Sequence, residues 1–291
     1  MRREPAQRWR VRGRELDVGR GVVMGILNVT PDSFYDGGRY VDASRALAHA
    51  RELMGEGAVI VDVGGESTRP GARPVAVEEE LKRVLPVIEG LAGESEVVIS
   101  VDTRHAEVAE QALRAGAHIV NDVSALADEG MAQVVAQYGA GVILMHMHGT
   151  PETMQDTPLQ AGEVVREVKD FLAVRLKKAV ERGIKKDALA VDPGIGFGKT
   201  FEANERLLAE LEEFLEFGVP VVVGVSRKRF IGARTGREVQ DRLAGSLAAA
   251  VLAYERGARV LRVHDVSATC DALRVADAIL QAGKGGSQEQ R

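Results

Sequence analysis

The sequence predicts a closed (β/α)₈ barrel, and three observations lead to this fold class. Eight short apolar segments each end in a polar residue, and amphipathic helical patterns lie between them. The segments are continuous and rich in β-branched residues, which is typical of parallel strands buried on both faces. Repeated strand–helix units in 291 residues, without a change of composition along the chain, favour a closed barrel over an open doubly wound sheet.

The expected strands share a polar residue at or near their C-terminal end. They end near Asn28, Asp62, Asp102, Asn121, Met145 and His146, Asp192, Ser226 and His264. Helical patterns cover residues 44–54, 78–91, 107–113, 162–181, 204–217, 241–254 and 268–281. Their apolar residues recur at spacings of three and four, as in helices that pack one face on a sheet.

Composition limits the class of protein. We expect one barrel domain over residues 16–283, an N-terminal extension at 1–15 and a disordered tail at 284–291. The net charge of −5 argues against nucleic-acid binding, which needs a basic surface. The single cysteine, Cys270, excludes an internal disulfide and fits a reducing, cytoplasmic location. No apolar run reaches the roughly 18 residues of a membrane span, so no membrane partner is expected.

The polar strand ends are the candidate site, because barrel active sites lie at the C-terminal ends of the strands. Helix capping would explain any single Asp or Asn, but it does not explain a lysine, an arginine and a histidine. Arg262 and His264 alternate along one strand, so their side chains point to the same side. We therefore expect one rim to collect Asn28, Asp62, Asp102, Asn121, Asp192, Lys228, Arg262 and His264.

The rim residues fall into two chemical groups. Asp102, Asn121 and Asp192 can donate to and accept from the edge of a flat heterocycle. Arg262, His264, Asn28 and the loop at residues 67–69 suit a polyanion, with a hard cation as a possible bridge. A heterocycle that carries phosphates satisfies both groups. The loops at residues 30–38 and 64–71 could close over such a ligand.

Two other motifs have weaker functional readings. The segment Gly194–Thr200 ends like a P-loop, but that motif needs a glycine at position 193, which is Pro193. His146 and His148 could form a metal pair, yet no third ligand is evident. We interpret them as a rim histidine beside a loop histidine.

Seven motifs in one order make the chain resemble the dihydropteroate synthases over nearly its whole length: GILNVTPDSFYDGG, DVGGESTRPG, SVDTRHAEVA, IVNDVSA, DPGIGFGKT, GVSRKRFIG and LRVHDV. The resemblance implies a TIM-type barrel, a homodimer and a transferase of folate biosynthesis that is a sulfonamide target. That enzyme condenses (7,8-dihydropterin-6-yl)methyl diphosphate with 4-aminobenzoate in the presence of Mg²⁺, giving 7,8-dihydropteroate and diphosphate. An SN1-like path fits, because the pterin can delocalise the positive charge.

The resemblance also implies roles for individual residues. The pterin would be held by Asp102, Asn121, Asp192 and Lys228, in a slot shaped by Met145, Phe197 and Gly224. Asn28 would ligate Mg²⁺, and the diphosphate would be bound by Thr68, Arg262 and His264. The aminobenzoate pocket would include Phe34, Arg69 and Pro70, and Ser226 and Arg229 complete the substrate-binding set. The catalytic residues would be Asp102, Lys228 and Asp36.

The chain departs from the family pattern at two positions. Arg229 follows Lys228 where the family usually has serine, so Arg229 either pairs with the aminobenzoate carboxylate or points away from it. Tyr35 replaces a commoner small residue in the first loop. The alternative functions are a pterin-binding methyltransferase, which needs no diphosphate site, and a pterin-binding barrel without catalysis.

Overall fold

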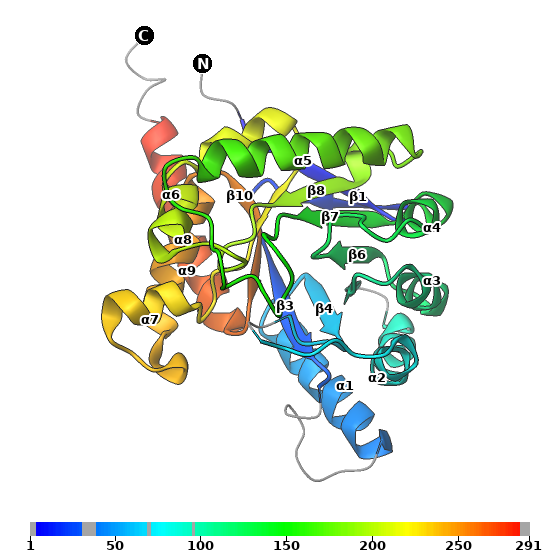
Figure 1. The fold of residues 1–291 in the computed structure, drawn as a ribbon. Helices are drawn as coiled ribbons and strands as arrows, with labels where there is room; N and C mark the ends of the chain where they lie inside the picture. Colours follow the sequence, from blue (N-terminus) through cyan, green and yellow to red (C-terminus); the bar gives the residue numbers. More distant parts are fainter. Residues whose placement is uncertain (1–3, 31–38, 69–70, 95–96, 286–291) are drawn as a thin grey trace.

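Eight parallel strands close into a barrel in the order β10-β3-β4-β5-β6-β7-β8-β9 (Figure 1). The structure is a computed structural model that describes residues 4–30, 39–68, 71–94 and 97–285. The barrel strands are β3 (Val22–Asn28), β4 (Ile60–Gly64), β5 (Val98–Asp102), β6 (Ile119–Asp122), β7 (Gly141–Met145), β8 (Leu189–Asp192), β9 (Val221–Val223) and β10 (Ala258–Val263). The predicted fold class is confirmed.

The helices lie outside the strands (Figure 1). They are α1 (Arg39–Gly55), α2 (Val77–Ala92), α3 (Ala106–Ala115), α4 (Met131–Tyr138), α5 (Val164–Glu181), α6 (Phe201–Ala209), α7 (Arg229–Thr235), α8 (Leu243–Glu255) and α9 (Val266–Gly285), with 3₁₀ turns η2 (Lys186–Ala188), η3 (Leu211–Phe217) and η4 (Val239–Asp241). The sequence did not predict α4 or α7. None of the described helices is long and apolar enough to cross a membrane.

The helix expected over residues 204–217 is divided, which corrects that prediction. α6 ends at Ala209, and the 3₁₀ helix η3 follows from Leu211. Residues three apart eclipse in a 3₁₀ helix, so Glu213 and Glu216 share one side. Both reach Lys169 of α5, with Nζ–O distances of 2.9 and 3.0 Å. A neighbouring, apolar side of η3 packs Phe214 into the core.

The barrel has an inner and an outer core. Inward-pointing strand residues form the inner core with the N-terminal segment: Val22, Met24, Ile60, Val98, Ile119, Ile143, Ala190, Val222 and Val260. The alternating strand residues pack outward against the helices. Met24 pairs in register with Ile60, and Ile60 pairs with Val98. The strands are therefore aligned so that inward residues form layers.

A β-hairpin, β1 (Arg8–Val11) and β2 (Arg14–Asp17), spans the boundary expected between the N-terminal extension and the barrel domain. Trp9 is fully buried in the inner core and donates its indole N–H to the Ala188 carbonyl at 3.0 Å. Arg12 and Arg14 donate to the carbonyls of Ala117 and Val97, which precede β6 and β5. The hairpin therefore closes the N-terminal end of the barrel, opposite the strand ends that carry the polar residues.

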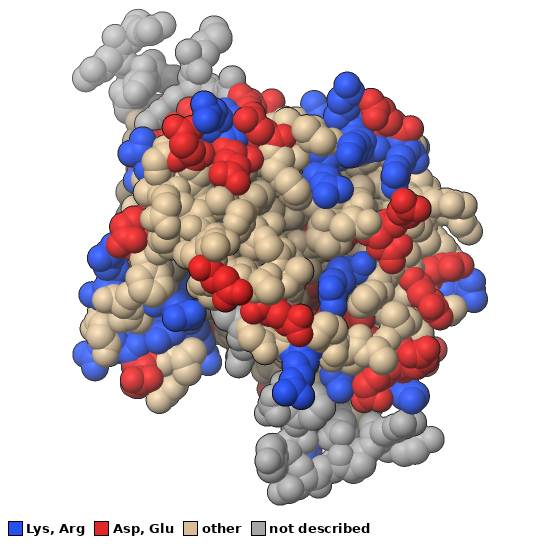
Figure 2. Space-filling view, viewed as in Figure 1, with Lys and Arg blue, Asp and Glu red and all other residues tan. Residues whose placement is uncertain are grey.

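Charged side chains of both signs are interspersed over the face seen in Figure 2. This agrees with the small net charge of −5. Lys and Arg side chains gather beside α7, at the left of the view.

Candidate active site

The inward-pointing face of most strands changes from apolar to polar as the strand ends. On β5 the sequence of inward residues is Val98, Ser100 and Asp102, and on β10 it is Val260, Arg262 and then His264 just after the strand. Because side chains alternate along a strand, the positions that build the inner core also deliver these polar groups. Asp102 lies in register with Asn121, and Met145 lies in register with Asp192.

Arg262 is the centre of the hydrogen-bond network at this rim. Its Nε donates to Asp62 Oδ2 at 2.6 Å, and its Nη2 donates to Asp102 Oδ2 at 2.7 Å. Asn121 Nδ2 also donates to Asp62 Oδ2, at 3.1 Å. Strands β10, β4, β5 and β6 thus supply one connected set of side chains, in which the half-buried Arg262 joins the buried Asp62, Asp102 and Asn121. The guanidinium has five N–H donors, and these contacts use two of them.

The rim carries more negative than positive charge around Arg262. Burial raises the pKa of Asp102 to about 7, with a further rise from Asp62, while Arg262 opposes the rise. Burial also opposes the charge of Arg262, but the carboxylates of Asp62 and Asp102 outweigh it and raise the pKa of Arg262. Two carboxylates therefore share one arginine. The remaining negative charge favours a cation or a positively charged ligand atom at this place.

Asp192 and the loop that follows it form the neighbouring part of the rim. Asp192 Oδ1 accepts the Gly194 N–H at 2.7 Å, and burial raises the pKa of this carboxyl although that N–H opposes the rise. The Lys228 ammonium lies 4.2 Å from the centre of the Phe197 ring, a cation–π contact. A carboxylate, an aromatic face and an ammonium are thus adjacent.

The Lys199 ammonium fixes the loop after β8 by binding its backbone carbonyls. Its Nζ lies 2.9 Å from the Gly194 carbonyl, the Phe197 carbonyl and His146 Nδ1. Burial lowers the pKa of Lys199 to about 7. Burial, together with Lys199, lowers the pKa of His146 to about 2, so the imidazole is neutral and acts as an acceptor. His146 is therefore a buried partner of Lys199.

The loop after β9 places Ser226 and Lys228. Arg227 between them has a left-handed φ of 56°, which costs an L-residue about 1–2 kcal/mol. Its guanidinium pairs with Asp265 through two bonds of 3.0 and 2.5 Å, and its N–H donates to Ser246 Oγ at 2.9 Å. These bonds offset the strain. Ser226 Oγ in turn accepts the His264 N–H at 3.2 Å and lies 3.0 Å from His264 Nδ1.

Asn28 ends β3 beside Gly64, with which it pairs in register. A Cβ on Gly64 would lie 3.8 Å from Asn28 Oδ1 and 3.7 Å from Asp102 Oδ2. The missing side chain thus leaves space between two oxygen atoms. Asp62 Oδ1 is also buried without a hydrogen-bond partner among the described residues. Amide and carboxylate oxygens are the ligands that Mg²⁺ takes in proteins, so the residues present fit that ion.

The remaining predicted site residues are distributed as follows. Met145 is buried at the end of β7, Gly224 and Thr68 are half-buried, and Arg229 is exposed as the first residue of α7. Phe34, Asp36, Arg69 and Pro70 lie outside the described residues, as does Tyr35. The predicted site residues described in the paragraphs above lie at the C-terminal rim or in the loops that follow it.

Two residues of the site were missed as functional groups. Asp62 was expected at the rim but received no role, although its position two residues after the inward Ile60 marks it as inward. Lys199 was discounted with the P-loop-like segment. The glycines of that segment, Gly194, Gly196 and Gly198, all have positive φ. Their alternate spacing indicates a tightly turned loop, in which an internal cation can bind the backbone carbonyls.

Comparison with known proteins identifies the family. The pterin-binding enzyme family model matches residues 24–264. The dihydropteroate synthase of Escherichia coli K12 is 48% identical over 270 residues, covering 93% of this chain and 95% of the relative. A Xanthomonas albilineans dihydropteroate synthase solved with 4-aminobenzoic acid is 50% identical, with a TM-score of 0.88 and 94% and 98% of the two chains covered. The Yersinia pestis enzyme, solved as a sulfonamide drug complex, is 43% identical, with a TM-score of 0.89 and 94% and 99% coverage. The chain therefore belongs to the dihydropteroate synthase family of pterin-binding enzymes.

Proposed function

We propose that this protein is a transferase that joins (7,8-dihydropterin-6-yl)methyl diphosphate to 4-aminobenzoate, giving 7,8-dihydropteroate and diphosphate in folate biosynthesis. The observation that carries the proposal is the rim network in which Asp62 and Asp102 share Arg262, at 2.6 and 2.7 Å, beside Asp192 and Lys228. One side of this rim suits a heterocycle and the other an anion. The relatives named dihydropteroate synthase support the assignment.

Asp192, Asn121 and Lys228 would hold the pterin. The Asp192 carboxylate is buried, and its Oδ1 accepts one N–H, from Gly194. A pterin offers an amino group and a ring N–H side by side, which a carboxylate can accept together. Phe197, which contacts Lys228, and Met145 would form apolar walls of the slot. Lys199 fixes Phe197 through its carbonyl.

The diphosphate would leave from the side of Arg262 and His264, with Thr68 as a further ligand. Arg262 keeps N–H donors beyond those bound to Asp62 and Asp102, and Ser226 orients the His264 ring. Asn28 would hold Mg²⁺. When bound, Mg²⁺ neutralises diphosphate charge and improves the leaving group.

An SN1-like displacement follows from these charges. The bond between the exocyclic carbon and the diphosphate oxygen breaks, and its electron pair leaves with the diphosphate. The resulting cation is spread over the pterin and is stabilised by the carboxylate of Asp102, with Asp36 proposed as a second carboxylate. The aminobenzoate nitrogen then forms the C–N bond with its lone pair and loses one proton to water. Its main requirement is positioning.

The aminobenzoate pocket is proposed to include Phe34, Arg69 and Pro70, together with Arg229. Arg229 is exposed at the start of α7, and we propose that it pairs with the substrate carboxylate. Arg229→Ser should then raise KM for 4-aminobenzoate severalfold and leave KM for the pterin diphosphate unchanged. An unchanged KM for 4-aminobenzoate would show that Arg229 points away.

A turnover assay tests the function directly. The purified protein is mixed with the pterin diphosphate, 4-aminobenzoate and Mg²⁺, and diphosphate and dihydropteroate are measured. Formation of both products in equal amounts, dependent on both substrates, supports the proposal. Methyl transfer from a methylated folate to a corrinoid without diphosphate release would favour the methyltransferase alternative. Pterin binding without any turnover would favour a non-catalytic barrel.

We also propose that the protein is a cytoplasmic homodimer that pairs through the outer face of α8 and α9. Leu252 on α8 and Val275 and Ile279 on α9 are 48%, 61% and 66% exposed. Val275 and Ile279 are four residues apart and so share one helix face. Ile279→Glu should yield a monomer in sedimentation velocity, whereas Val174→Glu, at an exposed position on α5, should not. A dimer that survives Ile279→Glu would contradict the assigned face.

A further inference from the structure

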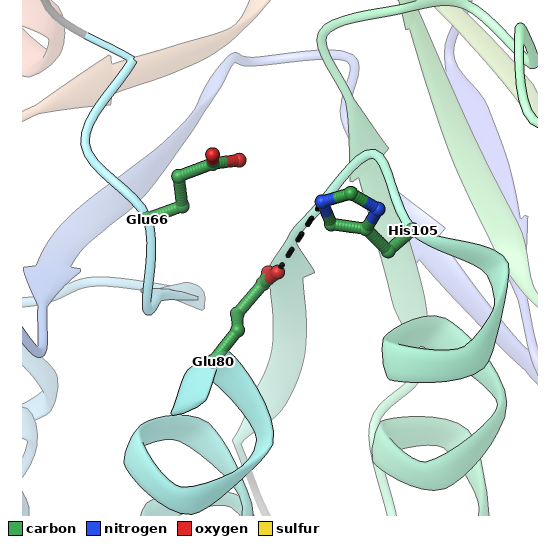
Figure 3. Close-up of side chains that lie close together, drawn as sticks. All are labelled: Glu66, Glu80 and His105. Atoms are coloured by element: carbon green, nitrogen blue, oxygen red, sulfur yellow. Dashed lines mark ion pairs between the residues drawn. The ribbon is translucent and has the colours of Figure 1, made fainter. Parts of the chain in front are cut away.

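A second group of potential ligands lies beside the rim, outside the proposed reaction. Glu66 belongs to the loop after β4, Glu80 to the first turn of α2, and His105 directly precedes α3 (Figure 3). One atom from each residue, a carboxylate oxygen or an imidazole nitrogen, lies within 4.8 Å of the other two. Three segments that are separate in sequence thus present donor atoms to one point.

Glu80 is the unusual member of the group. It is 0% exposed, and neither carboxylate oxygen has a hydrogen-bond partner among the described residues. His105 Nε2 is also buried and has no hydrogen-bond partner there; it lies 3.9 Å from Glu80 Oε2, an ion-pair distance beyond hydrogen-bond reach (Figure 3). A buried carboxylate without a partner is costly, so the site calls for a ligand.

Glu66 is held in place from its other side. Arg104 donates to both of its oxygens at 3.0 Å, and the Val75 N–H donates to Oε1 at 3.1 Å. Each carboxylate oxygen has two lone pairs, so Oε2, which accepts one N–H from Arg104 among the described residues, keeps one lone pair for a further ligand. Such orienting bonds are typical of the residues behind a metal ligand.

We propose that Glu66, Glu80 and His105 bind a first-row divalent cation of the Zn²⁺ class, at a site separate from that of the Mg²⁺ used in the reaction. One imidazole nitrogen and two carboxylate oxygens suit Zn²⁺ and its neighbours better than Mg²⁺, which prefers oxygen alone. Ligand bonds of about 2.0–2.2 Å place tetrahedral ligand atoms roughly 3.3–3.5 Å apart. The 3.9 Å between His105 Nε2 and Glu80 Oε2 is slightly longer than this, and the three ligand atoms, which lie within 4.8 Å of one another, would draw together around the ion.

Access supports the same assignment. The side chain of His105 is 27% exposed while that of Glu80 is 0% exposed, so an ion would enter past the imidazole. Three protein ligands leave a fourth position for water.

The proposed ion would connect the loop after β4 with α2 and α3. Thr68, a proposed diphosphate ligand, lies two residues beyond Glu66 in that loop. An ion that binds the folded state alone stabilises it by mass action. The ion would thus act on the fold and on the loop, and the proposal does not depend on the proposed reaction.

The test uses the full-length protein, stripped with a chelator and without substrates. Co²⁺ and Zn²⁺ are titrated separately, with heat of binding, the visible absorption of Co²⁺ and the thermal midpoint Tm as readouts. We expect one equivalent of either ion to bind, a Co²⁺ absorption band to appear, and Tm to rise. An unchanged Tm with no stoichiometric binding would overturn the proposal.

Matched variants locate the site. His105→Ala should abolish stoichiometric binding and the Co²⁺ band, and Glu80→Gln should do the same with nearly unchanged shape. His49→Ala is the control, since His49 lies 3.1 Å from Glu52 on an exposed part of α1, and it should bind as the unaltered protein does. Binding that survives His105→Ala would refute the assignment even if Glu80→Gln fails to fold. Asn28→Ala should retain Co²⁺ binding, which separates this site from that of Mg²⁺.

Discussion

Arg262 and Asp62 lie 200 residues apart in the sequence, yet Arg262 Nε donates to Asp62 Oδ2 at 2.6 Å. The two residues belong to β10 and β4, which lie on either side of β3 in the closed barrel. The contact therefore exists only when the last strand has joined the first. It couples the integrity of the barrel to the position of the guanidinium that the proposed reaction needs.

Asp62→Asn should weaken that position. Arg262 would keep its bond to Asp102 but lose the charge of its other partner, Asp62. The same Asp62 oxygen also accepts a hydrogen bond from Asn121 Nδ2. We expect kcat to fall at least about tenfold, because a misplaced group costs much of its effect. The free energy of unfolding should fall by about 1–3 kcal/mol. Diphosphate release and urea unfolding measure the two effects.

The control for this change is Glu202→Gln. Glu202 pairs with Arg234 at 3.2 Å on the exposed surface, where such pairs contribute about 0–1 kcal/mol. It should leave kcat unchanged and unfolding nearly so. If Asp62→Asn were equally harmless, Asp62 would have no part in placing Arg262.

His264→Ala should weaken binding of the pterin diphosphate more than binding of the bare hydroxymethyl pterin. Ser226 holds the His264 ring at the rim, and a hydrogen bond to a charged group contributes about 1.5–3 kcal/mol. We therefore expect roughly a 10- to 100-fold loss for the diphosphate alone, measured by calorimetry. Equal losses for both ligands would mean that His264 does not bind the diphosphate.

Trp9→Ala should destabilise the fold without affecting the site. Trp9 is fully buried at the N-terminal end of the barrel, and truncation of a buried tryptophan costs about 3–5 kcal/mol. Turnover per folded molecule should not change, since the proposed site lies at the other end. Urea unfolding and an assay well below Tm distinguish the two effects. A loss below about 1 kcal/mol would show that the hairpin is only weakly attached.

Stability should decline in acid partly through His118. Its Nδ1 accepts the Ile99 N–H at 3.2 Å, and burial lowers its pKa from 6.5 to about 4. Between these values the unfolded chain binds the proton more strongly than the folded chain, so unfolding is favoured as pH falls. The contribution is fully present above pH 6.5 and is lost towards pH 4.

His118→Gln keeps an acceptor for Ile99 but removes this titration. The free energy of unfolding of the variant should depend less on pH than that of the unaltered protein between pH 6.5 and 4. His49→Gln, on the exposed surface, should retain the full dependence. Identical slopes for His118→Gln and the unaltered protein would exclude His118 as a source of acid sensitivity.

The fold and much of the rim could be predicted because both follow from local pattern. Because side chains alternate along a strand, Asp102 lies on the same inward face as Val98, and Arg262 on the same face as Val260. The closed architecture then brings the strand ends together. The same logic holds for Asp192 after Ala190. These inferences need only the period of the strand and the rule that barrel sites lie at the C-terminal ends.

Features that depend on packing between elements could not be predicted. Glu80 reads as a surface residue beside Leu81 and Val84, yet it is buried because Gly65 lets α2 approach: a Cβ on Gly65 would lie 3.0 Å from Glu80 Cγ. The short α7 contains Gly232 and forms around the buried Phe230 and Ile231. Lys199 looks like a surface lysine until the carbonyls of its loop surround it.

The most direct test of the proposed pterin site is a calorimetric titration of the Asp192→Ala variant with the pterin diphosphate. Asp192 is buried and offers the acceptor that we assign to the amino and ring N–H groups of the pterin. Loss of that acceptor should abolish measurable binding, while circular dichroism and Tm confirm that the variant is folded. Tight binding of the pterin diphosphate by folded Asp192→Ala would contradict the assignment of the rim as a pterin site.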